Sequence, residues 1–174
     1  VSMGNGDIIG ILDLTLLDRG ASEEDLVRLC ERAVAHRVAA VCVFSEHVRF
    51  VRGLLPEEVK VASVVGGFPV GWRDPTKVSK AISEAIDFGA DEIDCVLEPT
   101  PNGGDASEED LQILSAMRDA CGEKTLKVII ETPLMDEHSI RAISRLAMAS
   151  GADFVKTCTG KRGDCTDAVS YTHL

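Results

Sequence analysis

AIDFGADEID at residues 85–94 and AMASGADFVK at residues 147–156 follow one pattern. In each copy a helical segment ends at a glycine, Gly89 or Gly151, and the chain then turns into a short strand. The alignment pairs Asp94 with Lys156, which are 62 residues apart, or two units of roughly 31 residues, the size of a βαβ repeat. We therefore expect Asp94 and Lys156 at equivalent positions of alternate strands.

Short apolar, β-branched segments alternate with amphipathic segments along the chain. The expected strands are Ile8–Leu14, Ala39–Phe44, Val59–Val65, Glu92–Leu97, Leu126–Glu131 and Phe154–Thr159. Helix starts are marked by Ser22 with Asp25, by Ser107 with Asp110, and by Asp74 followed by Pro75. The first helix should bury an apolar face formed by Leu26, Leu29, Cys30, Ala33 and Val34. This alternation predicts consecutive βαβ units on a parallel sheet.

The repeat favours an α/β fold of the (β/α)8 TIM-barrel class. Alternate strands of such a barrel supply the side chains of one interior layer, so Asp94 and Lys156 should face each other. Aligning Val38–Cys42 in the same way places Cys42 in this layer too. The alternative is an open, doubly wound sheet. That fold normally carries a glycine-rich phosphate loop after a strand, and the sequence has neither a GxGxxG nor a Walker A pattern.

The composition fits one globular domain of 174 residues, with 45% hydrophobic and 27% charged residues. A net charge of -11 argues against a nucleic-acid partner, because phosphate backbones are bound by clustered Lys and Arg. Residues 1–7 lack the features of a signal peptide, and no run approaches the roughly 18 apolar residues of a membrane span. We expect a cytoplasmic protein with no membrane partner. The sequence leaves a homo-oligomer open.

The six cysteines and four histidines show no spacing typical of a metal site. The sequence contains no CxxC, HxH or HExxH pattern. Widely spaced cysteines are more typical of reduced, mostly buried thiols than of a disulfide framework. We therefore expect free thiols and no bound metal.

Charged residues interrupt strands that should be almost entirely apolar, namely Asp13, Asp94, Lys127, Glu131 and Lys156. Buried charge is costly unless it is paired or used in chemistry. Burial and nearby positive charge favour the neutral amine of a lysine, which can attack a carbonyl and form a Schiff base, and Lys156 is the candidate. The imine accepts electrons from an adjacent carbon–carbon bond while a carboxylate, here Asp94, moves the protons. The alternative is a purely structural Asp94–Lys156 ion pair.

Thr157–Lys161 follows Lys156 at the carboxyl end of its expected strand, where barrel enzymes place their sites. Backbone amides and Lys161 could hold a phosphate there, and the alternative is a solvated loop lysine. The glycine-rich segment Gly66–Gly71 follows the third expected strand and is either a tight turn lining the same mouth or a flexible loop.

Six blocks together resemble the deoxyribose-phosphate aldolase family, in the family's order. They are Asp13–Thr15, Ala39–Val43, Gly66–Gly71, Gly89–Asp94, Leu126–Thr132 and Phe154–Lys161. The resemblance implies a lyase that reversibly cleaves 2-deoxy-D-ribose 5-phosphate to D-glyceraldehyde 3-phosphate and acetaldehyde in deoxynucleoside catabolism, using neither metal nor organic cofactor. It also implies the residue roles: Lys156 for the Schiff base, Asp94 for proton transfer, Asp13 and Cys42 for the substrate pocket, and Gly160 with Lys161 for the phosphate.

The sequence departs from the family at three places. Pro133 stands where the family usually has glycine, and residues 97–101 differ from the usual loop after strand four. The resemblance ends near Asp164, so the family's second essential lysine, on strand seven, and its phosphate loops after strands seven and eight have no counterpart here. Residues 169–174 read VSYTHL, which one frame of a common transposon sequencing adapter would encode.

We therefore expect residues 1–168 to form a partial barrel domain of roughly six βα units, followed by a non-native tail at residues 169–174. Such a fragment should leave its first and sixth strands with unpaired edges, fold poorly and be inactive. Two functional alternatives stay open for the complete protein. One is another lysine-dependent barrel aldolase with a different substrate, and the other is a catalytically silent barrel with a binding role.

Overall fold

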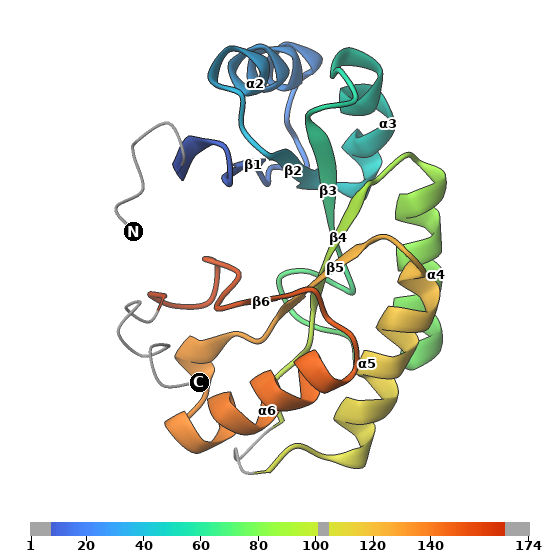
Figure 1. Cartoon of the computed structure of the whole chain (residues 1–174), viewed down its shortest axis with the longest axis vertical. Coiled ribbons are helices and arrows are strands. Elements are labelled where there is room, and N and C mark those ends of the chain that lie inside the picture. Colours follow the sequence, from blue (N-terminus) through green and yellow to red (C-terminus); the bar gives the residue numbers. More distant parts are fainter. Residues whose placement is uncertain (1–7, 101–104, 166–174) are drawn as a thin grey trace. The chain divides into compact units, whose positions relative to one another are not determined.

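A computed structural model describes residues 8–100 and 105–165 of the chain (Figure 1). The strands are β1 (Asp13–Leu16), β2 (Ala40–Phe44), β3 (Lys60–Val65), β4 (Glu92–Val96), β5 (Thr125–Ile129) and β6 (Phe154–Lys156). The helices between them are α2 (Glu23–His36), α3 (Ser45–Leu54), α4 (Pro75–Asp87), α5 (Glu108–Cys121) and α6 (Glu137–Ala149), with a short 3-10 helix, η1 (Thr132–Leu134), after β5. Strands and helices alternate as the sequence predicts.

The six described strands form one sheet in the order β1-β2-β3-β4-β5-β6. Pairing is parallel between β1 and β2, between β2 and β3, and between β5 and β6. An open doubly wound sheet reverses its strand order at a switch point, and this order follows the chain without reversal. The topology therefore matches successive βα units of a (β/α)8 barrel and excludes the alternative fold.

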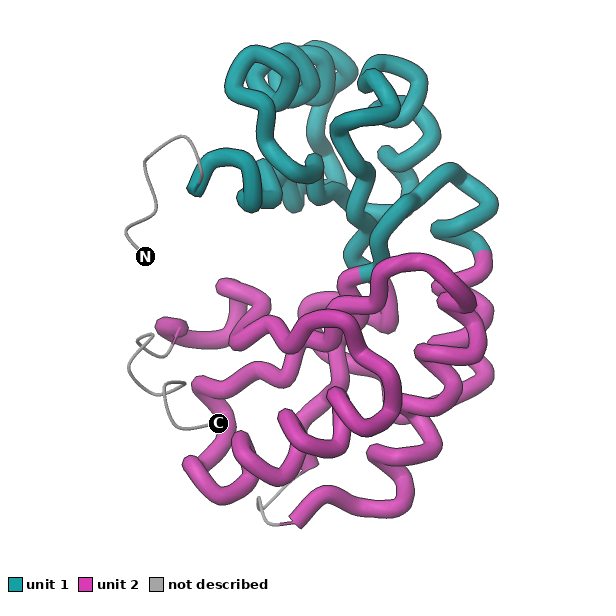
Figure 2. Tube along the Cα trace, viewed as in Figure 1, with its two compact units in different colours: residues 1–64, 84–93 teal, residues 65–83, 94–174 magenta. Residues whose placement is uncertain are grey.

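The chain divides into two compact units, coloured separately in Figure 2. Unit 1 comprises residues 1–64 and 84–93, and unit 2 comprises residues 65–83 and 94–174. In unit 1, the five residues of β2 are all buried. In unit 2, β5 and α5 bury Leu126, Val128, Ile129, Ile113, Leu114 and Met117. Successive strand residues point to opposite faces, so burial of nearly all of them means that both faces are covered, which explains why these sequences are nearly continuous apolar runs.

Each of the three expected helix starts is confirmed. The Ser22 hydroxyl accepts the backbone N–H of Asp25, whose side chain accepts the N–H of Ser22, and Ser107 with Asp110 repeats this capping box. Asp74 Oδ1 accepts the N–H groups of Thr76 and Lys77 at 3.0 and 3.1 Å. Side-chain oxygens thus satisfy N–H groups that have no partner inside the helix.

The first expected strand and two smaller details need correction. Residues 8–9 are helical and β1 begins only at Asp13, so Ile8–Leu14 is wrong over most of its length. Val34 does not belong to the buried face of α2, because 46% of it is exposed. The sixth strand ends at Lys156 rather than Thr159, since the polar residues after Lys156 form a loop. Apolar composition alone did not separate a helical turn from a strand at residues 8–14.

The described strands at the two ends of the sheet are β1 and β6, as expected for a chain that matches six units. Phe154 in β6 is 58% exposed, an unusual value for a large apolar residue in a parallel sheet. Among the helices of residues 8–100 and 105–165, none combines the length and apolar character needed to cross a bilayer. The proposed foreign tail at residues 169–174 lies outside the described residues.

Asp110 gives a stability prediction, because its side chain is only 1% exposed. Burial opposes its ionisation, but hydrogen bonds from Ser107 and Arg73 outweigh burial and lower the pKa of Asp110. A pKa that is lower in the folded than in the unfolded protein adds stability at pH values above the unfolded-state pKa of about 3.9. This stability is lost as the pH falls through the lower pKa of the folded state. We expect Asp110→Asn to reduce the free energy of unfolding by about 2 kcal/mol at pH 7.

The measurement is urea unfolding of the full-length protein and its variant at pH 7 and near pH 3. The difference between the two proteins should shrink at the lower pH. Asp25→Asn is the matched control, because Asp25 occupies the same position of the exposed capping box on α2 and should have a smaller effect. An equal loss for Asp110→Asn at both pH values would contradict the explanation.

Candidate active site

Asp94 and Lys156 meet in unit 2, as the internal repeat predicts. Asp94 is the third residue of β4 and Lys156 is the last residue of β6. The Lys156 Nζ donates a hydrogen bond to Asp94 Oδ2. The Asp94 side chain is fully buried, whereas 32% of the Lys156 side chain is exposed. A molecule that reaches this site therefore has access to the amine, while the carboxylate is held behind it.

Lys127 contributes a second ammonium group to the same carboxylate. Its Nζ lies 3.6 Å from Asp94 Oδ1, and only 8% of its side chain is exposed. Lys127 lies two residues before Ile129, which is the register partner of Lys156, so both lysines lie on one face of the sheet. The sequence marked Lys127 as a charge inside a strand but gave it no role. Its position means that Lys127 and Lys156 compete for one buried negative charge.

Glu131 organises the loop that follows Lys156. This residue lies just after β5, is fully buried, and adopts a left-handed backbone conformation with φ 51°. Its carboxylate accepts the Thr159 hydroxyl at 2.6 Å and the Thr159 backbone N–H at 3.2 Å. The Thr159 hydroxyl oxygen in turn accepts the backbone N–H of Lys161 at 3.2 Å. The only signal for this role in the sequence was an acidic residue at the end of an apolar strand.

Gly160 and Lys161 lie in this loop, at the carboxyl end of β6 where the sequence places them. Gly160 has φ 68°, a conformation that glycine adopts without strain, and Lys161 is exposed. Their role in binding phosphate stays a prediction.

Asp13 and Cys42 lie in unit 1, on β1 and β2. The parallel register pairs Asp13 with Ala40 and Thr15 with Cys42, so the two residues lie close along neighbouring strands. Cys42 is 1% exposed and Asp13 is half-buried. That Cys42 shares an interior layer with Asp94 and Lys156 stays a prediction, as does the role of Asp13 and Cys42 in lining the substrate pocket.

Cys158 and Cys165 form a disulfide, which overturns the expectation of free thiols at these two positions. The chain reverses after β6 through Gly160 and Gly163, which have φ 68° and 142°, and this brings the two Cα atoms to 5.9 Å. Spacing alone missed the pair because the turn between them depends on glycine conformations. Cys30, Cys42, Cys95 and Cys121 are free and buried, as expected.

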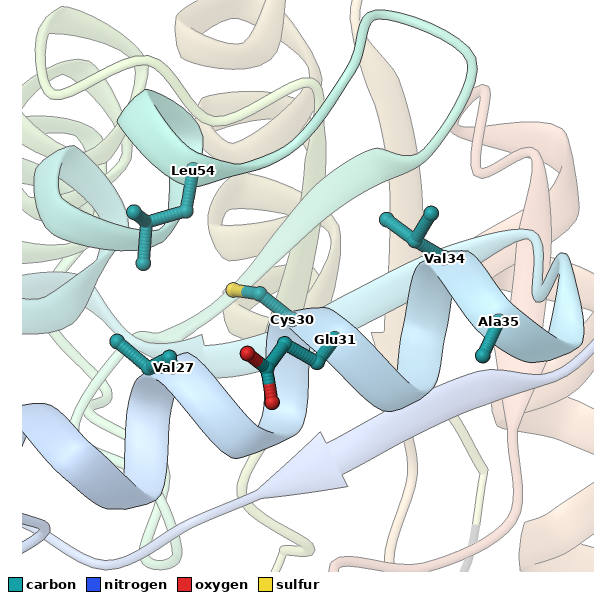
Figure 3. A pocket seen from close by; sticks show the side chains of 6 residues that line it. All are labelled: Val27, Cys30, Glu31, Val34, Ala35 and Leu54. Carbon is teal, nitrogen blue, oxygen red and sulfur yellow. The ribbon is translucent and has the colours of Figure 1, made fainter.

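A pocket in unit 1 has none of the features needed for amine chemistry. Figure 3 shows the six side chains that line it, Val27, Cys30, Glu31, Val34, Ala35 and Leu54. Glu31 is the single charged group among them, and burial raises the pKa of the Cys30 thiol against the opposing effect of Arg52. Within residues 8–100 and 105–165, no group of three or more His, Cys, Asp or Glu side chains is arranged to hold a metal ion.

The geometry in unit 2 suits carbonyl chemistry that depends on an amine. A partly exposed lysine can attack an aldehyde, and a buried carboxylate beside it can take and return protons. The same contacts would also form in a structural ion pair. Geometry alone therefore does not separate these two possibilities, and the catalytic roles of Asp94 and Lys156 stay predictions.

The model of the DeoC/LacD family aldolases matches residues 8–173. A deoxyribose-phosphate aldolase from Treponema denticola is 40% identical over 156 residues, which cover 86% of this chain and 70% of the relative. One from Metamycoplasma hominis is 34% identical over 149 residues, covering 86% of this chain and 69% of the relative. The chain thus spans about 70% of the length of these relatives.

Solved structures agree with this match. The tetrameric deoxyribose phosphate aldolase from Aeropyrum pernix superimposes with a TM-score of 0.80 at 28% identity, covering 95% of this chain and 70% of that one. An aldolase called QR15 superimposes with a TM-score of 0.84 at 28% identity, covering 94% and 73%. The strand order and these neighbours together establish the (β/α)8 class, of which the described residues contain six strands and the five helices α2 to α6 between them.

Proposed function

Because the chain belongs to the DeoC/LacD family of aldolases, we propose that its substrate is 2-deoxy-D-ribose 5-phosphate, cleaved reversibly to D-glyceraldehyde 3-phosphate and acetaldehyde. The observation that carries the proposal is the contact between the partly exposed amine of Lys156, at the carboxyl end of β6, and the buried carboxylate of Asp94 in β4. The names of the relatives from Treponema denticola and Metamycoplasma hominis support the choice of substrate.

In the proposed reaction, the neutral Lys156 amine attacks the C1 aldehyde of the open-chain sugar, and loss of water gives a protonated imine. A base removes the proton of the C3 hydroxyl, the C2–C3 bond breaks, and its electron pair moves toward the imine nitrogen to give an enamine. Glyceraldehyde 3-phosphate leaves at this point. Protonation at C2 and addition of water then release acetaldehyde and restore the amine. Asp94 is the group that we assign to these proton transfers, directly or through water.

The remaining site residues have supporting roles in this proposal. Gly160 and Lys161 hold the phosphate through backbone amides and a positive charge, at the strand end where barrel enzymes bind substrates. Asp13 and Cys42 line the sugar pocket. Lys127 lies beside Asp94 Oδ1 while Lys156 contacts Oδ2, and in this proposal it holds the carboxylate in position. None of these roles calls on a metal or an organic cofactor.

Borohydride trapping tests the proposal in the full-length protein of the native gene. Incubation with acetaldehyde and sodium borohydride should leave a reduced two-carbon adduct, which peptide mass spectrometry should locate on Lys156. Cleavage of 2-deoxyribose 5-phosphate is then compared with that of ketose phosphates. Preference for a ketose phosphate would move the protein to another class of lysine-dependent barrel aldolase. Absence of any adduct would favour a silent barrel in which Asp94 and Lys156 form only an ion pair.

We further propose that the protein acts in the cytoplasm and assembles as a homo-oligomer. The aldolase from Aeropyrum pernix is described as a tetramer, which supports the proposal of a homo-oligomer. Size-exclusion chromatography with light scattering of the full-length protein measures it directly.

A further inference from the structure

A bidentate ion pair joins the loop after β6 to the loop after β4 in unit 2. Arg162 Nη1 donates to Glu98 Oε2 at 2.5 Å, and Nη2 donates to Glu98 Oε1 at 2.9 Å. Both side chains are mostly covered, with 22% of Arg162 and 20% of Glu98 exposed. Parallel, charge-assisted hydrogen bonds of this kind fix distance and orientation together. Salt screens such a covered pair less than it screens an exposed one.

Glu98 is itself held in place from two directions. Its Oε2 accepts the backbone N–H of Gly71 at 2.9 Å, and its backbone oxygen accepts Arg73 Nη1 at 2.8 Å. A Cβ added to Gly71 would overlap the backbone nitrogen of Glu98, so the loop after β3, which contains Gly71, packs directly against the loop after β4. Arg73 Nη2 also donates a hydrogen bond to Asp110 Oδ1, at the start of α5, at 3.0 Å. Arg162 is therefore tied to a rigid anchor rather than to a mobile surface carboxylate.

The other end of the loop after β6 is held by Glu131 through Thr159 and the N–H of Lys161. Lys161 thus lies between two carboxylate anchors, Glu131 before it and Glu98 after it, the latter acting through Arg162. The hydrogen bonds from Arg162 to Glu98 raise the pKa of Arg162, with burial acting in the opposite direction. Since both terminal nitrogens of Arg162 already bind Glu98, this guanidinium is engaged before any substrate arrives.

We propose that Glu98 and Arg162 are positioning residues for the substrate phosphate, and that their ion pair fixes the loop of residues 157–163 so that Gly160 and Lys161 are held ready to bind it. This proposal rests on the proposed function, because it assumes a phosphorylated substrate. Holding the loop before binding lowers the entropy lost on complex formation. The pair should therefore affect affinity for the phosphorylated sugar and leave the chemistry at Lys156 unchanged.

Glu98 and Arg162 were not candidates in the sequence. Arg162 followed a more obvious lysine, and Glu98 fell in residues 97–101, which the sequence marked only as a departure from the family. In the structure, Glu98 in this unusual loop binds Arg162 and so holds the loop that carries Lys161.

The test uses Arg162→Gln, Glu98→Gln and the double variant in the full-length protein, with kcat and KM measured for 2-deoxyribose 5-phosphate and for unphosphorylated 2-deoxyribose. Arg141→Gln is the matched control, since Arg141 forms an exposed pair with Glu137 on α6. Each assay is run with and without reductant, so that the Cys158–Cys165 disulfide does not confound the result. Calorimetric titration with inorganic phosphate gives a second readout that needs no turnover.

Each single variant should raise KM for the phosphorylated sugar about tenfold, the loss expected for one charge-assisted hydrogen-bonded pair. The kcat for this sugar and the kcat/KM for 2-deoxyribose should stay within about twofold of wild type, and phosphate affinity should fall in parallel with the KM effect. The double variant should be no worse than either single one, because both remove the same interaction. Arg162→Lys, which keeps the charge, should recover part of the affinity.

Equal losses on both sugars would show a general structural role and overturn the proposal, as would an unchanged KM and phosphate affinity. If the wild type binds phosphate but does not cleave 2-deoxyribose 5-phosphate, the proposed function fails while the phosphate titrations still decide the role of the pair. Thermal melts of all variants identify any that do not fold, and Arg162→Lys then carries the comparison.

Discussion

Lys156→Leu should lower kcat/KM for aldol cleavage by about five orders of magnitude in the full-length protein, because it removes the nucleophile on which the covalent route depends. Borohydride should then trap no adduct. A coupled assay for glyceraldehyde 3-phosphate measures the first effect, and intact-protein mass spectrometry measures the second. Leucine also removes one of two ammonium groups beside a fully buried carboxylate, so a loss of stability must be separated from a loss of chemistry.

Lys156→Arg is the matched variant that makes this separation. Arginine keeps a positive charge next to Asp94, but its guanidinium stays protonated in proteins and does not act as the amine nucleophile. We expect it to melt close to the wild type and to be as inactive as the leucine variant. Trapping that persists in Lys156→Leu would contradict the assignment, and an adduct found on Lys127 would transfer the role to that residue.

Much of the fold follows from patterns that depend on neighbours in the sequence. The capping boxes of Ser22 and Ser107 form within one helical turn, and the glycines at 89 and 151 have the positive φ values expected after a helix. The repeat also placed Asp94 and Lys156 together, since equivalent positions on alternate strands of such a sheet share a face. The helix caps and the repeated strand positions both predict the same alternating α/β fold.

Features that depend on loop conformation could not be predicted in this way. The Cys158–Cys165 disulfide requires two glycines with positive φ between the cysteines. The Glu98–Arg162 pair joins residues 64 positions apart, each in a loop that has no periodic pattern. Strand periodicity fixes which face a residue occupies, whereas a loop has no such constraint. The strand positions of Asp94 and Lys156 could therefore be predicted from the sequence, and the ion pair between the neighbouring loops could not.

Asp94→Asn distinguishes proton transfer from nucleophilic attack. Asparagine keeps the size of the side chain and a hydrogen-bond acceptor for Lys156, but it loses the charge and the ability to exchange a proton. We expect kcat to fall by about three orders of magnitude, within the range for loss of a general acid–base group. Acetaldehyde should still be trapped on Lys156, more slowly, because imine formation needs the amine and not the carboxylate. Retained trapping with lost turnover would therefore mark Asp94 as the proton-transfer group.

Asp153→Asn provides the control for removing a carboxylate from unit 2. Asp153 accepts the backbone N–H of Leu126 at 2.8 Å and pairs with Arg118 at 3.1 Å, so its role is to hold β5 and the start of β6. The hydrogen bond from Leu126 lowers the pKa of Asp153, with burial opposing it. Its variant should lower the melting temperature and leave kcat close to wild type. If Asp94→Asn behaves in this same way, Asp94 is a structural partner of Lys156 and Lys127, and another group must move the protons in the reaction.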